Sequence, residues 1–444
     1  MKKLLLKSKK EKKTRIKWGI LASAAIVAAA AAAFAVLTQP RAVLAEGKIA
    51  EPSYPEGENT SAAPDSAFLE GIQKFSVRSA SRILKETEGE NRLYSPISLA
   101  MALSMMAQTS DGATRSETLE LLGTDSIDRL RSQTGSLFRF LYEDGENDTL
   151  KLANSIWLNQ ELAFHRDTLD LLAKDYYASS YSVDFAAADT PKQISQWISE
   201  NTGGLLGGEN SDFVIPERPL ALLFNTIYFR SQWNTSFGDY LTKEDTFTKS
   251  SGETVTCPFM QTAYSGCDFT VGDGYSRVSS YFTSGCRMNF ILPEEGSSPE
   301  AILGEEALLA KALYESGDAV THRGEVTLRV PKFDFHTSLD LKENLKALGI
   351  VSAFSDSADF SPLSGTPASV SDVIQEAKIS VDERGCEAAA YTEIAINATS
   401  ALLPEGEKFE MVLNRPFLFA IEGPASEEGQ PRPLLFIGVV NNPK

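Results

Sequence analysis

Histidine is scarce in this sequence, and that limits the chemistry it could perform as an enzyme. The 444 residues contain three histidines, His165, His322 and His336, and none of them stands in an HExxH motif. The nucleophile motif GxSxG and the phosphate-binding motif GxxxxGK are also absent. Isolated histidines of this kind are typical of structural positions, so the sequence does not predict an enzyme.

Cysteine is almost as scarce. The four cysteines, Cys257, Cys267, Cys286 and Cys386, are spaced too widely for a CxxC metal or redox motif. The sequence therefore predicts no metal site and no cofactor. The first three lie within thirty residues of one another, so one disulfide among them stays open, because pairing cannot be read from a sequence.

Basic residues are scarce beyond the N-terminal segment. Residues 1–45 hold ten of the 42 Lys and Arg but only one of the 60 Asp and Glu, so the remainder has 32 basic and 59 acidic residues, a formal charge of −27. A chain with so much negative charge repels nucleic acids and anionic membranes. The sequence therefore predicts no nucleic-acid partner.

The first 45 residues have the pattern of an export signal. Residues 1–17 carry nine basic side chains, residues 18–37 are uncharged and rich in alanine, and Val43-Leu44-Ala45 has the small residues typical of a cleavage point. The uncharged run is also long enough to span a bilayer as an uncleaved anchor. We expect a signal peptide removed after Ala45 and a secreted protein, with membrane contact only if the segment stays uncut.

The segment after the signal has a different composition. Residues 46–65 contain three prolines and few apolar side chains, which predicts a flexible linker. From Phe68 to Leu84 apolar residues recur at near-helical spacing and predict an amphipathic helix. Behind Pro96, a run of alanine and methionine predicts a helix that is buried in the core.

Near the C-terminus, residues 386–396 alternate with a period of two. The small or apolar positions are Cys386, Ala388, Ala390, Thr392, Ile394 and Ile396. This alternation predicts a strand with one face fit for a core. Glu and Ala are good helix formers, however, and four of them fill residues 387–390. Propensity alone does not decide between strand and helix.

This stretch resembles the hinge of the serpins, serine protease inhibitors whose reactive loop is exposed as bait and inserts into a sheet after cleavage. The residues that resemble the hinge are Glu383, Gly385, Cys386, Glu387, Ala388, Ala389, Ala390 and Thr392. Of these, Cys386 stands where the family usually has Thr, and Tyr391 beside them replaces a common Ala. Tyr391 lies on the odd-numbered face, so its bulk is compatible with insertion.

Further stretches resemble the family in the same order along the chain. They include 91–123, 152–154, 184–185, 197–206, 222–233, 258–260, 288–293, 328–333, 340–341, 348–350, Phe354, 358–361, 415–417 and 435–443. The resemblance implies a serpin domain over residues 66–444. Its expected fold class is α+β, with three β-sheets, about nine helices and an exposed reactive-centre loop.

The resemblance also implies a set of residues that control the opening of the main sheet, in the regions called shutter and breach. These residues are Ser95, Ser98, Asn225, Trp233, Lys332 and Gln375. Gln375 replaces the usual His, and its amide can still donate and accept toward Ser95, Ser98 and Asn225 but cannot titrate. Lys332 and Glu383 match an ion pair at the top of the sheet.

The function that the resemblance implies is suicide inhibition by a monomer, in which a target serine protease forms a covalent acyl-enzyme with the loop. The family's spacing from Gly385 places the reactive bond between Thr399 and Ser400, with Ala401 and Leu402 as alternatives because the loop is long. No Lys or Arg lies between Gly385 and Lys408, so we expect an elastase-like target. The alternative is a non-inhibitory serpin that acts as a binding or carrier protein.

The N-terminal pattern predicts a secreted form that begins near Glu46. Edman sequencing or intact-mass analysis of culture medium and membranes measures where the chain begins. An intact Met1 terminus confined to membranes would show that the segment is an anchor instead.

Overall fold

The computed structural model describes residues 42–43, 47–55, 63–85, 89–208, 215, 219–272, 274–314, 321–386, 407–427 and 429–444. Within these ranges the chain forms nine α-helices and three β-sheets of eight, nine and two strands. The predicted α+β class with three sheets and about nine helices is confirmed. The predicted reactive-centre loop falls mostly on residues 387–406, outside the described ranges.

The helices are α2 (Ser66–Ile83), α3 (Pro96–Thr109), α4 (Gly112–Leu121), α5 (Ile127–Leu141), α6 (Arg166–Asp175), α7 (Thr190–Asn201), α8 (Pro299–Leu303), α9 (Glu306–Tyr314) and α10 (Lys342–Ala347). Two short 3₁₀ helices are η2 (Asp239–Leu241) and η3 (Ser352–Phe354). Among these residues, no helix is long and apolar enough to cross a bilayer.

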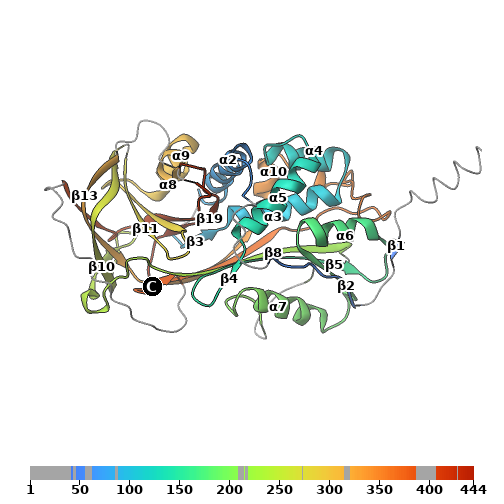
Figure 1. The fold of residues 1–444 in the computed structure, drawn as a ribbon, viewed down its shortest axis with the longest axis horizontal. Helices are drawn as coiled ribbons and strands as arrows, with labels where there is room; N and C mark the ends of the chain where they lie inside the picture. The colour runs from blue at the N-terminus through green and yellow to red at the C-terminus, as the bar shows by residue number, and fades with distance from the viewer. Residues whose placement is uncertain are drawn as a thin grey trace, which may run out of the picture.

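The main sheet has the strand order β14 (Phe333–Asp340), β15 (Ile374–Val381), β16 (Gly385–Cys386), β8 (Ala221–Gln232), β5 (Thr149–Asn159), β7 (Ala178–Val183) and β2 (Gly47–Ala50), with β4 (Glu143–Asp144) beside β5. It runs along the long axis of the molecule, with α3 and α5 on one face and α7 on the other (Figure 1).

The second sheet has the order β17 (Glu407–Val412), β13 (Thr321–Pro331), β10 (Thr254–Gly272), β11 (Tyr275–Tyr281), β12 (Arg287–Pro293), β18 (Phe417–Glu422), β19 (Leu434–Val440) and β3 (Arg92–Tyr94), with β9 (Lys243–Thr248) on β10. The third sheet pairs β1 (Ala42–Val43) with β6 (Phe164–His165). Both large sheets contact α3, through β8 and β19, so this helix lies between them.

The two helices predicted from apolar spacing are present. Asp65 caps α2, because its carboxylate accepts a hydrogen bond from the backbone N–H of Phe68 at 2.7 Å. Ser95 caps α3 in the same way, and Pro96 occupies the first turn, where a missing N–H costs nothing. The methionines of α3 are buried or nearly so, which confirms that this helix is part of the core.

The prediction of a flexible linker over residues 46–65 is wrong for residues 47–55. Gly47–Ala50 pair antiparallel with β7 as the edge strand β2. Beyond the strand, Pro52 is buried, and the ring of Tyr54 lies 5.4 Å from that of Tyr142. Composition does not reveal such a segment, because its backbone partners come from β7 and its packing partners from α5.

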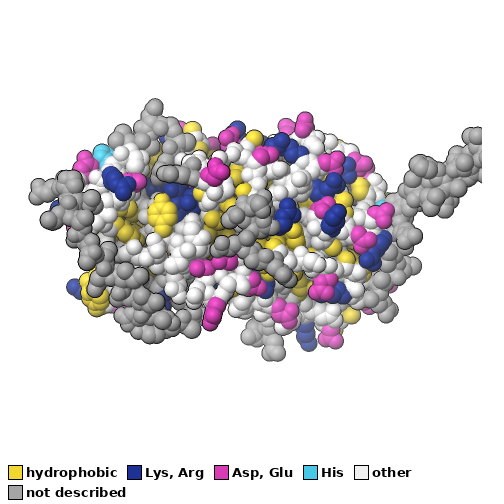
Figure 2. Space-filling model, viewed as in Figure 1, with side chains coloured by type: hydrophobic (Ala, Val, Ile, Leu, Met, Phe, Trp, Pro, Cys, Tyr) yellow, Lys and Arg dark blue, Asp and Glu magenta, His cyan; other side chains and the backbone are white. Residues whose placement is uncertain are grey.

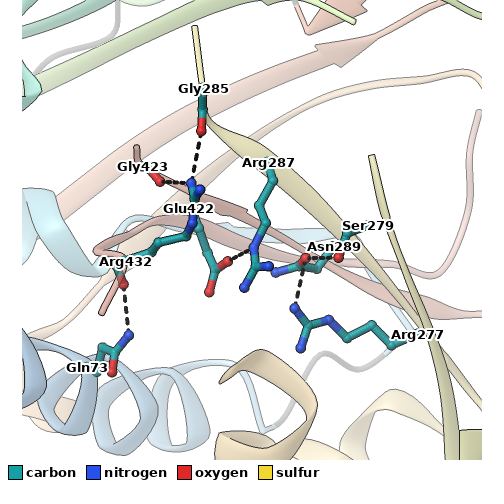
Figure 3. A network of polar contacts seen from close by, with 9 residues as sticks. All are labelled: Gln73, Arg277, Ser279, Gly285, Arg287, Asn289, Glu422, Gly423 and Arg432. Carbon is teal, nitrogen blue, oxygen red and sulfur yellow. Dashed lines mark hydrogen bonds and ion pairs between the residues drawn. The ribbon is translucent and has the colours of Figure 1, made fainter. Parts of the chain in front are cut away.

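A polar network links β12, β18 and the loops beside them in the second sheet to α2 (Figure 3). Glu422 on β18 is fully buried and forms an ion pair with Arg287 on β12. Arg432 donates hydrogen bonds to the carbonyls of Gly285 and Gly423 at 2.9 and 2.8 Å. Gln73 of α2 then donates to the carbonyl of Arg432 at 3.0 Å. Because buried charges cost free energy unless they are paired, this network fixes how the strands and α2 pack.

The close packing at β19 generates a stability prediction. A Cβ on Gly438 would lie 2.4 Å from the Phe419 ring, so Gly438→Ala must shift a buried aromatic side chain. We expect the variant to lose about 1–3 kcal/mol of stability. A drop in the urea unfolding midpoint measures this loss. Gly365→Ala is the matched control, since its Cβ meets no atom within 4 Å, and an equal loss in both variants would contradict the packing argument.

Candidate functional site

The hinge begins inside the main sheet. Gly385 and Cys386 form the short strand β16 between β15 and β8. Cys386 lies opposite Val381 on β15 and opposite Ser231 on β8, and Gly385 lies opposite Gln232. The strand interpretation of the hinge is therefore correct for these two residues. The remaining predicted hinge residues, Glu387 to Thr392, lie outside the described ranges.

Strand β8 approaches β16 so closely at Ser231 that position 385 has to be a glycine. A Cβ at this position would lie 2.1 Å from the backbone carbonyl oxygen of Ser231, a distance that real side chains do not adopt. Any other residue would push β16 away from β8 and break the pairing. The absence of a side chain at Gly385 is therefore what allows β16 to pair with β8.

The first of the hinge residues, Glu383, is anchored by the predicted ion pair. Lys332 Nζ lies 2.7 Å from Glu383 Oε2, and the hydroxyl of Thr242 donates to Glu383 Oε1 at 2.8 Å. The Glu383 side chain is 11% exposed and that of Lys332 is 37% exposed. Since the pair is partly solvated, it contributes about 1 kcal/mol or less.

Burial raises the pKa of the Glu383 carboxyl, but the hydrogen bonds from Lys332 and Thr242 outweigh it and hold the pKa below its usual value. A carboxyl that is more acidic in the folded state stabilises that state above its ordinary pKa. This stabilisation is lost as the pH falls through the lowered value. The anchor therefore holds at neutral and mildly acidic pH.

Trp233 joins the same anchor at the end of β8. Its indole Nε1–H donates to the carbonyl of Asp382 at 2.9 Å, and its backbone N–H donates to the carbonyl of Arg384 at the same distance. The indole stacks on Phe282 with the ring centroids 4.3 Å apart. Trp233 thus binds the backbone on both sides of Glu383, at Asp382 and at Arg384.

Directly below Cys386, the sheet is not closed. Within the described residues β15 and β8 share no ladder of their own, and β16 alone joins them. A cavity of about 20 Å³ lies at this point. Its lining comes from β8, β15, β16, β18, β19 and the turn after α7, and consists of Leu205, Ile227, Tyr228, Phe229, Lys378, Ile379, Ser380, Cys386, Ile421 and Phe436. The gap has an apolar floor that matches the small, apolar face of the hinge.

The predicted shutter cluster is divided into two parts. Gln375 accepts a hydrogen bond from the backbone N–H of Ser95 at 2.8 Å and donates to its carbonyl at 2.9 Å. Ser95 Oγ accepts from the N–H of Ser98 at 3.3 Å. Asn225 does not contact these residues through any of its hydrogen bonds. It donates instead to Asn154 Oδ1 at 2.7 Å, within its own half of the sheet.

The sequence did not predict several polar residues around the hinge. Asp148 accepts hydrogen bonds from the hydroxyls of Ser231 and Thr283, beside the point where Cys386 pairs. Thr242 and Asn154 hold predicted residues in place but were not predicted themselves. These residues come from separate segments, so no local motif identifies them. Asn154 and Ser231 belong to stretches that the family resemblance had included, whereas Asp148, Thr242 and Thr283 do not.

The predicted reactive bond, Thr399 and Ser400 with the alternatives Ala401 and Leu402, lies outside the described residues. The chain is described again from Glu407, where β17 pairs parallel with β13. The predicted bond is therefore bounded by two described strands, β16 at the main sheet and β17 at the edge of the second sheet.

Comparison with known proteins agrees with this geometry. Residues 70–443 match the family described as Serpin (serine protease inhibitor). The chain is 29% identical over 377 residues to Serpin-ZX of Arabidopsis thaliana, covering 80% of this chain and 93% of that protein.

Two solved structures are similar over most of their length. Native tengpin, a thermophilic serpin, matches with a TM-score of 0.74 and 26% identity, over 90% of this chain and all of tengpin. Human thyroxine-binding globulin, complexed with thyroxine, matches in fold with a TM-score of 0.73 and 23% identity, over 85% of this chain and 99% of that protein. On the extent of these matches, and with the hinge in place between β15 and β8, the chain belongs to the serpin family.

Proposed function

We propose that this protein is a secreted suicide inhibitor of serine proteases with elastase-like specificity. The observation that carries the proposal is the position of β16, because the hinge is already paired at the top of a sheet whose lower part has no ladder between β15 and β8. A strand that continues from Cys386 would run between β15 and β8, which share no ladder of their own among the described residues.

In the proposed reaction the target protease supplies the chemistry. Its serine oxygen attacks the carbonyl carbon of the reactive bond, the peptide C–N bond breaks, and the new amino terminus leaves with a proton from the protease histidine. The protease is then held by an ester bond to the residue before the cut. Insertion of the loop carries the protease along before water can hydrolyse the ester.

Insertion gains free energy because backbone groups exchange water for ladder hydrogen bonds and the small side chains of the even-numbered face become buried. That face carries no charge from Cys386 to Ile396, so no unpaired charge has to enter the sheet.

The alternative function is that of a carrier. The similarity to thyroxine-binding globulin, at 23% identity, concerns the fold. The carrier alternative does not require an inserting face whose side chains are all small or apolar, whereas this chain has one. The hinge composition therefore favours inhibition.

Target choice follows from the loop sequence. A trypsin-like pocket with an acidic base has no Lys or Arg to bind between Gly385 and Lys408. On the face shown in Figure 2, acidic and basic side chains are interspersed and form no field of one sign.

The hinge proposal predicts a change from inhibitor to substrate. Ala388→Arg or Ala390→Arg would bring an unpaired charge into the sheet, at a cost of several kcal/mol, so insertion should fail while cleavage persists. The amount of SDS-resistant protease complex should fall at least about tenfold relative to cleaved protein. Ala389→Arg is the control, since an odd position faces the other way. Unchanged trapping by the Ala388 and Ala390 variants would exclude the insertion mechanism.

The loop sequence predicts the target class and the cut. Incubation with an elastase should give a covalent complex, and the released peptide should place the cut between Ala398 and Leu403, first at Thr399–Ser400. Chymotrypsin- or subtilisin-like proteases should be trapped less efficiently, and trypsin not at all. Intact-mass analysis measures the cut. Efficient covalent trapping of trypsin, or an elastase cut before Ala395, would contradict the assignment.

A further inference from the structure

The outer side of the main sheet ends in two strands of very different character. β7 pairs in parallel with β5 over all six of its residues, from Ala178 to Val183, without a bulge. It contains no charged residue, no glycine and no proline, and five of its six residues are buried. A strand of this kind, if left unpaired along one side, is a template for pairing with another chain. Among the described residues, β2 occupies that side.

β2 has the features by which natural edge strands avoid further pairing. It is four residues long and carries the exposed Lys48, and its register with β7 shifts between Lys48 and Ala50. Pro52 and Pro55 follow shortly after the strand and have no backbone N–H to offer another strand. Short length, lysine, irregular pairing and proline each oppose the addition of a further strand. The edge that β2 presents is therefore protected, whereas the edge of β7 is not.

The segment that supplies β2 is fastened to the body of the protein at two points. Ile49 packs against an apolar cluster made largely of residues from β5 and α6. The ring of Tyr54 stacks on two rings of the α5 segment, with centroids 5.4 Å from Tyr142 and 6.3 Å from Phe138. Burial of these two apolar side chains, together with the backbone pairing, holds the segment on β7.

We propose that residues 47–54 are an edge cap, and that β7 is an interface for a second copy of this chain whenever the cap is absent. Two copies related by a two-fold axis join antiparallel through β7. This pairing uses the uncovered edge of both copies, so the product is a closed dimer and not a fibre. No step involves the reactive bond, so the proposal does not rest on the proposed inhibition.

The test compares a protein that begins at Glu46 with a truncated form that begins at Glu56. Light scattering after size-exclusion chromatography measures the mass of each over a range of concentrations. The longer form should stay monomeric, and the truncated form should approach about twice its own mass as its concentration rises. An excess of a synthetic peptide of residues 46–55 should return the truncated form to the monomer. The same peptide with Tyr54→Ala should require at least about tenfold more, because it lacks the stacked ring.

A substitution in β7 tests whether the association uses this strand. Tyr181→Lys places a charge in the uncovered strand, and charges at a sheet edge oppose pairing, so the truncated form with this change should stay monomeric. Tyr240→Lys is the matched control, because Tyr240 is a tyrosine that is 84% exposed on η2, away from β7. The truncated form with Tyr240→Lys should still dimerise. Circular dichroism verifies that each variant is folded.

A folded truncated form that stays monomeric at every concentration would overturn the proposal, and so would a dimer that neither the peptide nor Tyr181→Lys affects. If truncation prevents folding, Tyr54→Ala in the protein that begins at Glu46 decides. Loss of the stacked ring should loosen the cap, so this variant should associate at high concentration, whereas Tyr240→Ala should not. A Tyr54→Ala protein that stays monomeric would also overturn the proposal.

Discussion

The structure depends on an incomplete backbone ladder in the main sheet. A strand edge normally pairs or faces water, but within the part of the chain that the structure describes β15 and β8 are joined only by the two residues of β16. A ladder hydrogen bond contributes about 1 kcal/mol net, so a strand of about ten residues bonded on both edges gains an amount comparable to the whole stability of a domain. The described residues therefore leave the space between β15 and β8 without a backbone ladder beyond β16.

The two halves of the sheet are anchored separately, which makes their separation possible. On one side, Gln375 of β15 binds the backbone of Ser95 at the start of α3, and Thr337 of β14 accepts from the N–H of Leu93 on β3 at 3.2 Å. On the other side, Asn225 and Asn154 link β8 and β5 to the end of α6. Because neither set of bonds crosses the gap, widening it breaks none of them.

The sequence predicted what is encoded locally or matched by the family pattern. Apolar spacing and Ser95-Pro96 predicted α3, and the hinge glycine and the Lys332–Glu383 pair are where the resemblance placed them. It did not predict β2, because a four-residue edge strand has no pattern of its own and takes its bonds from β7. It also grouped Asn225 with Gln375, since it could not show that Gln375 turns to the Ser95 backbone and leaves Asn225 to Asn154.

The two-residue strand β16 has a kinetic consequence. Starting a new strand between two others is slow, because chain entropy is lost before the contacts that reward it are made. Here the first residue pairs exist before any cut, so the conformational search for an initial contact is already complete. A strand that extends from this nucleus has one favoured register. A slip by one residue would turn Glu387 and Glu393 toward the apolar floor of the gap. In the insertion proposed above, this pre-formed nucleus would set both the rate and the register of strand growth.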